Sequence, residues 1–280
     1  MHDDLFGLKD KHAIVWGGGF GMGERTSIRL ADVGAQVAVV DLEMARAEKV
    51  AGAINLGGGK AVALAADVRR EESVKRALAD AEAALGPVDV MATVIGLGVW
   101  EQVVDMSLDQ FNQAIELNLT SFFLPAREVA RSLMKHGKPG AIACVSSVSG
   151  LTAAPNHAGY GAAKAGMINL VRTMADEWGP WGIRVNAAMP GSAATPRITL
   201  SEEGVARMNA AMEEKLPLGR AATPDELAKG ILFLLSDLAS YVTGHNLHVD
   251  GGWTSTFLMQ SHTKEEGPVM ASGVRRPKDF

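Results

Sequence analysis

The segment Gly17-Gly18-Gly19-Phe20-Gly21-Met22-Gly23 decides the fold, because it joins a short apolar strand to a helix. Glycine permits a tight turn, and without side chains the backbone can approach a pyrophosphate, which then faces free N–H groups at the helix start. Gly17, Gly21 and Gly23 fit such a turn, since Met22 stands where a strict G-x-G-x-x-G spacing requires glycine. Alone, a glycine-rich turn is weak evidence, because any tight strand-to-helix turn uses glycine.

A carboxylate downstream strengthens the interpretation of this turn as a dinucleotide site. Asp41 ends the next apolar strand, where it can accept hydrogen bonds from adenosine ribose hydroxyls and would repel a 2′-phosphate. Phe20 and Leu42, which flank the expected phosphate position, are not basic. We therefore predict NAD rather than NADP as cofactor. Arg25 and Arg46 are evidence against this choice of NAD, although exposed positions on helices would account for both arginines.

Short apolar runs alternate with helical patterns along the chain. The predicted strands, which lack polar–apolar alternation, are residues 13–15, 36–40, 61–64, 88–94, 140–145, 184–188 and 246–249. The predicted helices are residues 22–33, 43–55, 72–85, 108–135, 160–178 and 224–235. Ser107 begins a capping-box pattern, and Thr223 precedes a proline at the first helical position. Continuous apolar strands alternating with helices predict an α/β fold with a doubly wound parallel sheet.

The composition excludes several classes of protein. Of 280 residues, 47% are apolar and 21% charged, with a net charge of −5, so the chain can bury a core and is not a disordered polyelectrolyte. Mild acidity disfavours nucleic-acid binding, which needs clustered Lys and Arg. Cys144 is the one cysteine, so no internal disulfide can form, which suits the cytoplasm. We find no signal-peptide pattern and no apolar run long enough to cross a membrane.

The pair Tyr160 and Lys164 points to acid–base chemistry. Residues four apart share a helix face, and an ammonium near a phenol favours the phenolate, lowering a pKa that is otherwise near 10. Such a tyrosine can exchange a proton with an alcohol or carbonyl. Ser147 follows the apolar strand at 140–145, where its hydroxyl could hold a substrate oxygen. A surface Tyr–Lys pair and a polar residue closing a strand are the plain alternatives.

Taken together, these motifs resemble the short-chain dehydrogenase/reductase family over residues 8–252. The motifs that carry the resemblance, in order, are the glycine turn, Asp41, Asn118-Leu119, Ser146-Ser147, Tyr160 with Lys164, Ile183-Arg184-Val185-Asn186, Pro190-Gly191 and His248-Val249-Asp250-Gly251-Gly252. The resemblance implies a Rossmann-like sheet of about seven strands with helices on both faces. It also implies one catalytic domain over residues 1–252, a tail over residues 253–280, and hydride transfer between nicotinamide C4 and a carbinol carbon.

The resemblance also implies roles for individual residues. Tyr160 would be the general acid/base, Ser147 would hold the substrate oxygen, and Lys164 would lower the tyrosine pKa and bind the nicotinamide ribose. Asn118 would bend its helix and hold a water linking Lys164 to solvent, while Thr195 would contact the nicotinamide carboxamide. The full cofactor set expected from the turn and the resemblance is Gly17, Gly19, Phe20, Gly21, Met22, Gly23, Asp41, Leu42, Asp67, Val68, Gly96, Tyr160, Lys164, Pro190, Gly191 and Thr195.

The chain departs from the family pattern at two places. Trp16 stands where threonine usually opens the glycine motif, and Thr93-Val94-Ile95-Gly96 stands where Asn-Asn-Ala-Gly is usual. In the family, that threonine ties the turn to the fourth strand through the asparagine region. Because both sides of the contact change together, we expect an apolar contact of Trp16 with Val94 or Ile95 to replace the hydrogen bond.

The substrate pocket should form where the carboxyl ends of the strands open. The expected segments are 97–100, 151–157 and 192–216, the last of which acts as a mobile lid in the family. The expected apolar lining is Val99, Trp100, Leu151, Met189, Ile198 and Met208. With Trp100, Ser147 and Tyr160 as contacts, this lining favours a hydrophobic secondary alcohol or ketone. His157 could touch substrate, but we interpret it as a solvated loop residue.

Two other functions stay open, an NADPH-dependent 3-oxoacyl or ketone reductase and a non-catalytic dinucleotide-binding sensor. Trp16 motivates the second. The resemblance implies a homotetramer, or a homodimer, assembled partly through helices 108–135 and 160–178. The apolar start of the tail could add to such an interface. His245 and His248 lie three apart on a strand and so point to opposite faces, and we expect no metal site.

Overall fold

In a computed structural model, residues 4–196, 201–213 and 216–255 are described. These residues form one sheet of seven parallel strands in the order β3-β2-β1-β4-β5-β6-β7. The strands are β1 (His12–Trp16), β2 (Gln36–Asp41), β3 (Lys60–Ala65), β4 (Val90–Thr93), β5 (Gly140–Val145), β6 (Ile183–Pro190) and β7 (Asn246–Val249). The doubly wound parallel sheet predicted from the sequence is confirmed.

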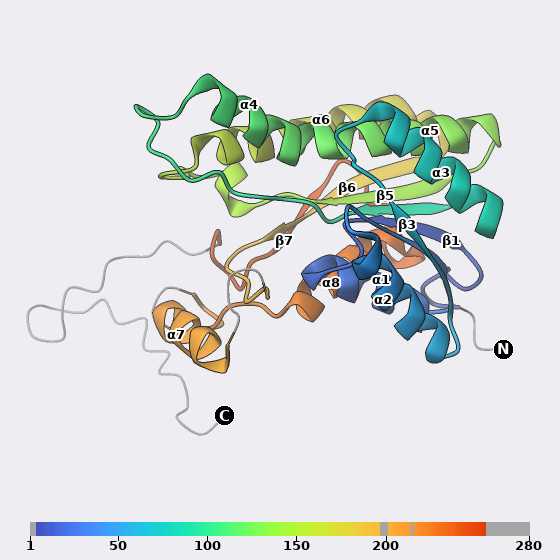
Figure 1. The fold of residues 1–280 in the computed structure, drawn as a ribbon, viewed down its shortest axis with the longest axis horizontal. Coiled ribbons are helices and arrows are strands. Elements are labelled where there is room, and N and C mark those ends of the chain that lie inside the picture. Colours follow the sequence, from blue (N-terminus) through green and yellow to red (C-terminus); the bar gives the residue numbers. More distant parts are fainter. Residues whose placement is uncertain (1–3, 197–200, 214–215, 256–280) are drawn as a thin grey trace, which may run out of the picture.

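Helices cover both faces of this sheet, as Figure 1 shows. One face carries α3 (Glu71–Leu85), α4 (Leu108–Ile115), α5 (Ser121–Lys135) and α6 (Ala158–Trp178). The other carries α1 (Gly21–Asp32), α2 (Met44–Leu56) and α8 (Pro224–Leu235). Helix α7 (Glu202–Met212) stands apart from both layers, beyond one end of the sheet. Short turns are η1 (Glu116–Thr120), η2 (Val148–Gly150), η3 (Gly179–Trp181) and η4 (Asp237–Ala239).

The apolar character of the strands follows from this two-sided cover. In β1, Ile14 and Trp16 enter the core beneath α3 and α5, whereas Ala13 and Val15 enter the core beneath α1, α2 and α8. Successive side chains of a strand point to opposite faces, so a strand covered on both faces must be apolar throughout. This explains why the predicted strands lack alternation.

The strand order places a switch point beside β1. The chain proceeds from β1 outward to β2 and β3, and then returns to β4 on the other side of β1. In doubly wound sheets, ligands bind at the carboxyl ends of the strands where the winding direction reverses. Here that edge holds the glycine turn after β1 and the segments after β4, β5 and β6.

The helix predicted over 108–135 is interrupted. It consists of α4, the π-helical turn η1 and α5, with Asn118 buried inside η1. A π turn contains one residue more per turn than an α-helix and is common at functional sites. The predicted capping box at Ser107 is confirmed, and α8 begins as predicted with Pro224 after Thr223, whose side chain forms a second capping box with Glu226. Helix α7 was not among the predicted helices, although its segment has helical spacing.

Some predictions concern residues outside the described part of the chain. The tail prediction falls there from residue 256 onward, as does Ile198 of the predicted pocket. Among the described helices, none is long and apolar enough to cross a membrane.

Candidate active site

The four residues expected to act in catalysis meet at the carboxyl edge of the sheet. Ser147 follows β5, Tyr160 and Lys164 lie in the first two turns of α6, and Asn118 lies in η1. Ser147 is 8% exposed, Lys164 1% and Asn118 not at all. Buried polar side chains need partners, and the contacts of these residues connect them to the strand ends.

Lys164 is an ammonium enclosed by backbone. Its Nζ donates to the carbonyl of Val145 at 2.7 Å and to that of Ile95 at 3.4 Å, so it joins the ends of β5 and β4. Burial lowers the pKa of Lys164 to about 8, because removal from water disfavours the charged form. A lysine poised near neutral pH beside a phenol is typical of sites that move protons.

Tyr160 differs from the expectation in one respect. Burial raises the pKa of the Tyr160 phenol, and a hydrogen bond with Ser147 opposes that rise only in part. The sequence predicts a lowered pKa through Lys164, but that ammonium lies 5.6 Å from the centre of the tyrosine ring and donates to backbone carbonyls. In this arrangement, desolvation therefore outweighs the nearby positive charge.

The π turn gives Asn118 its contacts. Its Nδ2 donates to the carbonyls of Leu97 and Ala114, each at 2.9 Å, and its Oδ1 accepts from the amide of Leu97 at 3.0 Å. Asn118 therefore fixes the segment after β4 to the helix opposite. Gly96 lies between this amide and Lys164, where a Cβ would meet Asn118 Oδ1 at 3.3 Å and Lys164 Nζ at 3.5 Å. The predicted bend at Asn118 is present as the π turn.

The glycine turn fits a phosphate group. Gly17 has φ +76°, and a Cβ on Gly23 would lie 1.8 Å from the carbonyl oxygen of Gly17. Both positions therefore require glycine. Phe20 precedes the first turn of α1, and no side chain caps that helix among the described residues. The free amides at the start of a twelve-residue helix are a suitable site for an anion.

Asp41 lies directly beside this turn. Its Oδ2 accepts from the amide of Gly19 at 3.1 Å, its Oδ1 accepts from the amide of Glu43 at 3.2 Å, and the residue is 8% exposed. Arg46 is also close: a Cβ on Gly19 would lie 2.8 Å from Arg46 Cβ. The Arg46 guanidinium pairs with Glu43 at 2.8 Å and lies over the ring of Phe20.

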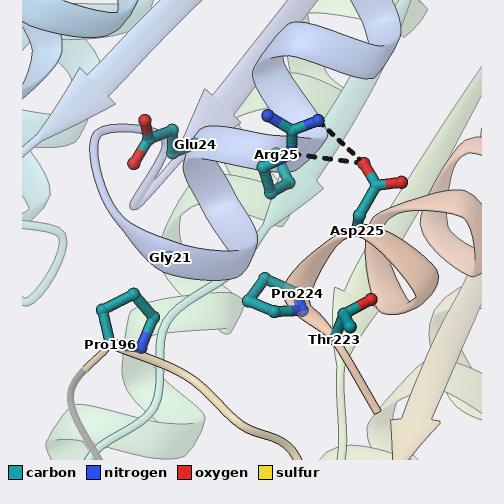
Figure 2. A pocket seen from close by; sticks show the side chains of 7 residues that line it. All are labelled: Gly21, Glu24, Arg25, Pro196, Thr223, Pro224 and Asp225. Atoms are coloured by element: carbon teal, nitrogen blue, oxygen red, sulfur yellow. Dashed lines mark hydrogen bonds and ion pairs between the residues drawn. The ribbon is translucent and has the colours of Figure 1, made fainter. Parts of the chain in front are cut away.

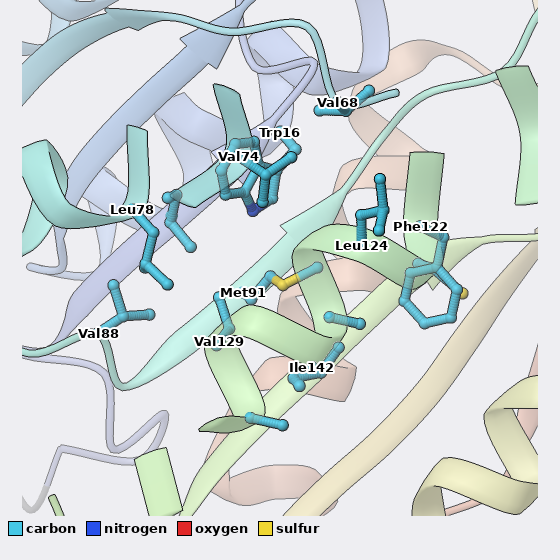
Figure 3. Packing of buried hydrophobic residues seen from close by; sticks show 14 of the residues in the cluster. Trp16, Val68, Val74, Leu78, Val88, Met91, Phe122, Leu124, Val129 and Ile142 are labelled. Atoms are coloured by element: carbon cyan, nitrogen blue, oxygen red, sulfur yellow. The ribbon is translucent and has the colours of Figure 1, made fainter. Parts of the chain in front are cut away.

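Asp67 and Val68, which belong to the expected cofactor set, have contacts within the chain. Asp67 accepts two hydrogen bonds from the Arg69 guanidinium, each 2.8 Å long, and this contact lowers the pKa of the Asp67 carboxyl. Val68 is 9% exposed and belongs to the same core as Trp16 and Val74, as Figure 3 shows.

The segment after β6 contains Pro190 and Gly191, two residues of the expected cofactor set. Pro190 ends β6, and a Cβ on Gly191 would meet the carbonyl oxygen of Asp250 at 3.0 Å. Ala193 and Ala222 then form a short bridge. Figure 2 shows the resulting groove of about 260 Å³, which lies between the glycine turn and the start of α8. Its lining is Gly21, Glu24, Arg25, Pro196, Thr223, Pro224 and Asp225.

Asp225 connects α8 to α1 beside this groove. It pairs with Arg25 at 3.1 Å and with Arg29 at 2.7 Å, and Lys229 adds a third cation at 3.0 Å. Hydrogen bonds from Arg29 are the largest cause that holds the pKa of the Asp225 carboxyl well below its usual range. This contact joins Arg25, which also lines the groove, to α8.

The predicted substrate lining is met only in part. Leu151 is 50% exposed and borders a second cavity of about 490 Å³. Met189, however, is fully buried, with its sulfur 3.2 Å from Asn246 Nδ2. It is therefore a core residue, because β6 extends through it to Pro190. Among the described residues, no cluster of three His, Cys, Asp or Glu side chains could hold a metal.

Trp100 and His157 form an aromatic stack with Tyr160. The ring centres of Trp100 and His157 are 3.9 Å apart, and those of His157 and Tyr160 are 5.1 Å apart. His157 is partly buried and packs between these two rings. A signal was available in the sequence, because His157 stands three residues before Tyr160 at the start of the same helix.

Comparison with known proteins finds dehydrogenases that are similar to this chain over most of its length. A family model described as enoyl-(acyl carrier protein) reductase matches residues 18–254. The 2,5-dichloro-2,5-cyclohexadiene-1,4-diol dehydrogenase of Sphingobium indicum is 36% identical over 251 residues, covering 89% of this chain and 98% of that one. The glucose 1-dehydrogenase of Gluconobacter oxydans is 36% identical and covers 87% and 92%. A short-chain type dehydrogenase/reductase from Mycobacterium marinum superposes with a TM-score of 0.84 at 34% identity, covering 90% and 99%.

Proposed function

This chain belongs to the short-chain dehydrogenase/reductase family and is an oxidoreductase acting on a CH–OH group, and we propose that it transfers hydride between NAD(H) and a ring-bearing, largely apolar secondary alcohol. The observation that carries this proposal is the meeting of Ser147, Tyr160 and Lys164 beside the glycine turn. The named substrate of one relative, a chlorinated cyclohexadienediol, is a ring that carries hydroxyls.

Ser147 and Tyr160 hold the carbinol oxygen in this mechanism. Ser147 lies close enough to Tyr160 to oppose part of the rise in the pKa of its phenol, so an alcohol oxygen that contacts both would be held at one point. In the oxidising direction, the Tyr160 oxygen takes the hydroxyl proton, and in the reducing direction it returns the proton to the carbonyl oxygen. When bound, the dinucleotide supplies the hydride acceptor at nicotinamide C4.

Lys164 supports the charged form of Tyr160. Its ammonium occupies a fixed position because two backbone carbonyls accept from it. Burial raises the pKa of Tyr160, so the phenolate depends on positive charge nearby. We propose that Lys164 supplies this charge and binds the nicotinamide ribose, and that Asn118 holds the Gly96–Leu97 segment against it.

NAD is the proposed cofactor because of Asp41. Its carboxylate lies beside Gly19 at the end of β2, the position from which ribose hydroxyls can be bound and a 2′-phosphate repelled. The glycine cradle and the start of α1 fit the pyrophosphate. Arg46 already pairs with Glu43, which supports a role for Arg46 within the fold over a contact with a 2′-phosphate.

We propose a homotetramer, with a homodimer as the smaller possibility, acting in the cytoplasm. Phe111 on α4 and Phe123 on α5 are each 37% exposed, which supports association through these helices. Light scattering of the purified chain would measure the state. We further propose residues 1–252 as one catalytic domain, followed by the tail.

A turnover screen tests the proposed function. Secondary alcohols with and without rings are supplied with NAD or NADP, and the absorbance of the reduced cofactor is followed. We expect turnover with NAD and a loss of at least about 100-fold in kcat for Tyr160→Phe. Undiminished turnover by Tyr160→Phe would refute the mechanism, and a clear preference for NADP would refute the cofactor assignment.

A further inference from the structure

A second carboxylate lies beside Asp41 at the start of α2. Glu43 directly precedes this helix, and its amide donates to Asp41 Oδ1 at 3.2 Å. Among the described residues, the Glu43 carboxylate makes no capping bond to α2. It pairs with the Arg46 guanidinium at 2.8 Å, three residues further along the chain. Asp41 thus fixes the backbone of Glu43, and Glu43 in turn holds the side chain of Arg46.

Arg46 lies at the glycine turn. A Cβ on Gly19 would be 2.8 Å from Arg46 Cβ and 2.9 Å from Asp41 Oδ2, so Arg46 and Asp41 contact Gly19 on the same side. The guanidinium carbon of Arg46 is 5.2 Å from the ring centre of Phe20. A guanidinium within about 6 Å of an aromatic ring centre is attracted to that ring. The Arg46 side chain therefore begins beside Asp41 and ends over Phe20.

The pairing with Glu43 determines what this positive charge can bind. NADPH differs from NADH by a phosphate on the adenosine ribose, and an arginine near the end of β2 can accommodate that phosphate through charge-assisted hydrogen bonds. Glu43 competes for the same N–H groups of Arg46. A 2′-phosphate can take over the guanidinium only by displacing Glu43, whereas the ribose hydroxyls of NADH require no such change.

We propose that Glu43 is a specificity-determining residue, which withholds the Arg46 guanidinium from a 2′-phosphate and so adds to the discrimination by Asp41 against NADPH. This inference rests on the proposed function and deepens it. With two carboxylates and one guanidinium, the cluster has a net negative charge and repels a phosphate. Without the Glu43 charge, the cluster is neutral, and the contact with Phe20 still holds the guanidinium at the site.

The test measures the Kd values of NADH and NADPH by cofactor fluorescence. Glu43→Gln should tighten NADPH binding by about fivefold, the upper strength of an exposed ion pair, and change NADH binding by less than about twofold. Arg46→Gln in the Glu43→Gln background should remove this gain, because the released cation is then absent. The gain should also decrease at high ionic strength, since salt screens the attraction between exposed charges.

A control on the same helix separates the ion pair from net charge. Glu48 is an exposed residue of α2, and Glu48→Gln removes the same charge, so it should leave the ratio of the two Kd values within about twofold of the wild type. The melting temperature of each variant is measured in parallel. A merely structural role of Glu43 at the start of α2 would lower the melting temperature and weaken both cofactors equally.

The outcomes separate the two proposals. If the wild type binds NADPH more tightly than NADH, the assignment of NAD fails, and the role of Glu43 fails with it. If the wild type prefers NADH but Glu43→Gln leaves the ratio unchanged, the proposed function stands and the role of Glu43 is refuted. A gain in NADPH binding that survives Arg46→Gln, or that Glu48→Gln reproduces, would also refute it, because the released arginine would not be the cause.

Discussion

Trp16 and Thr93 lie opposite each other on the neighbouring strands β1 and β4, and each buries a polar side-chain atom that has no hydrogen-bond partner among the described residues. Trp16 Nε1 and Thr93 Oγ1 thus stand where the family joins this turn to the fourth strand by a hydrogen bond. Ile95 packs on the core cluster that contains Trp16, whereas Val94 packs on the cluster at the other face of the sheet.

This relationship predicts the effect of restoring the family residue. Trp16→Thr should lower the free energy of unfolding by about 3–5 kcal/mol, because a large buried side chain is removed and leaves a cavity. In the double variant with Thr93→Asn, a regained hydrogen bond should return about 1 kcal/mol. Urea unfolding measures both. Strictly additive effects of the two changes would argue against a coupling between these positions.

Because Lys164 is buried, we expect the free energy of unfolding to depend on pH. Its pKa falls from 10.5 to about 8 on folding, which corresponds to a cost of roughly 3 kcal/mol while the amine is charged in both states. Lys164→Met should therefore raise the free energy of unfolding by about 1 kcal/mol at pH 7, after the loss of two hydrogen bonds.

Whether stability rises or falls with pH follows from which state of the protein, folded or unfolded, releases the Lys164 proton first. Between pH 8 and 10.5 the folded wild type releases its proton before the unfolded chain does, so its stability rises and the advantage of Lys164→Met should shrink. Unfolding of the wild type and of Lys164→Met at pH 7 and pH 10 measures this difference. Lys164→Met should be inactive at both pH values. An advantage that is independent of pH would contradict burial as the cause of the lowered pKa.

Asp41 should decide between the two dinucleotides. Asp41→Ala removes the acceptor for the ribose hydroxyls and the repulsion of a 2′-phosphate, so it should weaken NADH binding by about tenfold and NADPH binding by less. Cofactor fluorescence gives both Kd values. Asp41→Asn is the matched control, since it removes the charge and keeps an acceptor near Gly19. Equal losses for both cofactors would count against the ribose contact.

Asp225 should stabilise the contact of α1 with α8. Asp225→Asn is expected to lower the free energy of unfolding by about 1–2 kcal/mol at pH 7, because three cations lose a partly buried partner. The lowered pKa of Asp225 means that this stabilisation is complete above the ordinary carboxyl pKa and is lost as the pH falls below it. The difference should therefore shrink below about pH 4.

Unfolding of both proteins at pH 7 and pH 3 provides the measurement. Asp80, an exposed carboxylate on α3, offers a control, and Asp80→Asn should change stability by less than about 0.5 kcal/mol. Equal effects of the two substitutions would show that the cluster around Asp225 contributes no more than an isolated surface charge.

Local patterns allowed much of this molecule to be predicted. The glycine turn, the alternation of strands with helices and the helix starts at Ser107 and Thr223 depend on residues close in sequence, and each is present. The spacing of Tyr160 and Lys164 placed them on one helix for the same reason. Their joint position with Ser147 followed from the parallel strand order, which brings the carboxyl ends of the strands to one edge.

The remaining features depend on contacts between distant segments. The raised pKa of Tyr160 results from burial, which periodicity does not measure. Trp100 and His157 are 57 positions apart in the chain, and their stack exists only because a β-bridge joins the two loops. Met189 was assigned to the pocket because the extension of β6 to Pro190 is not visible in the residue pattern.

The π turn at Asn118 also restricts how the chain can vary. Each residue added to or removed from a helix rotates everything beyond it by about 100°. The wider π turn accommodates the extra residue of η1, so the face of α4 that meets α6 and the face of α5 that enters the core keep their relation. A deletion inside η1 can therefore be absorbed by conversion to a regular α turn, whereas one inside α4 would rotate Phe122, which is fully buried, away from the core.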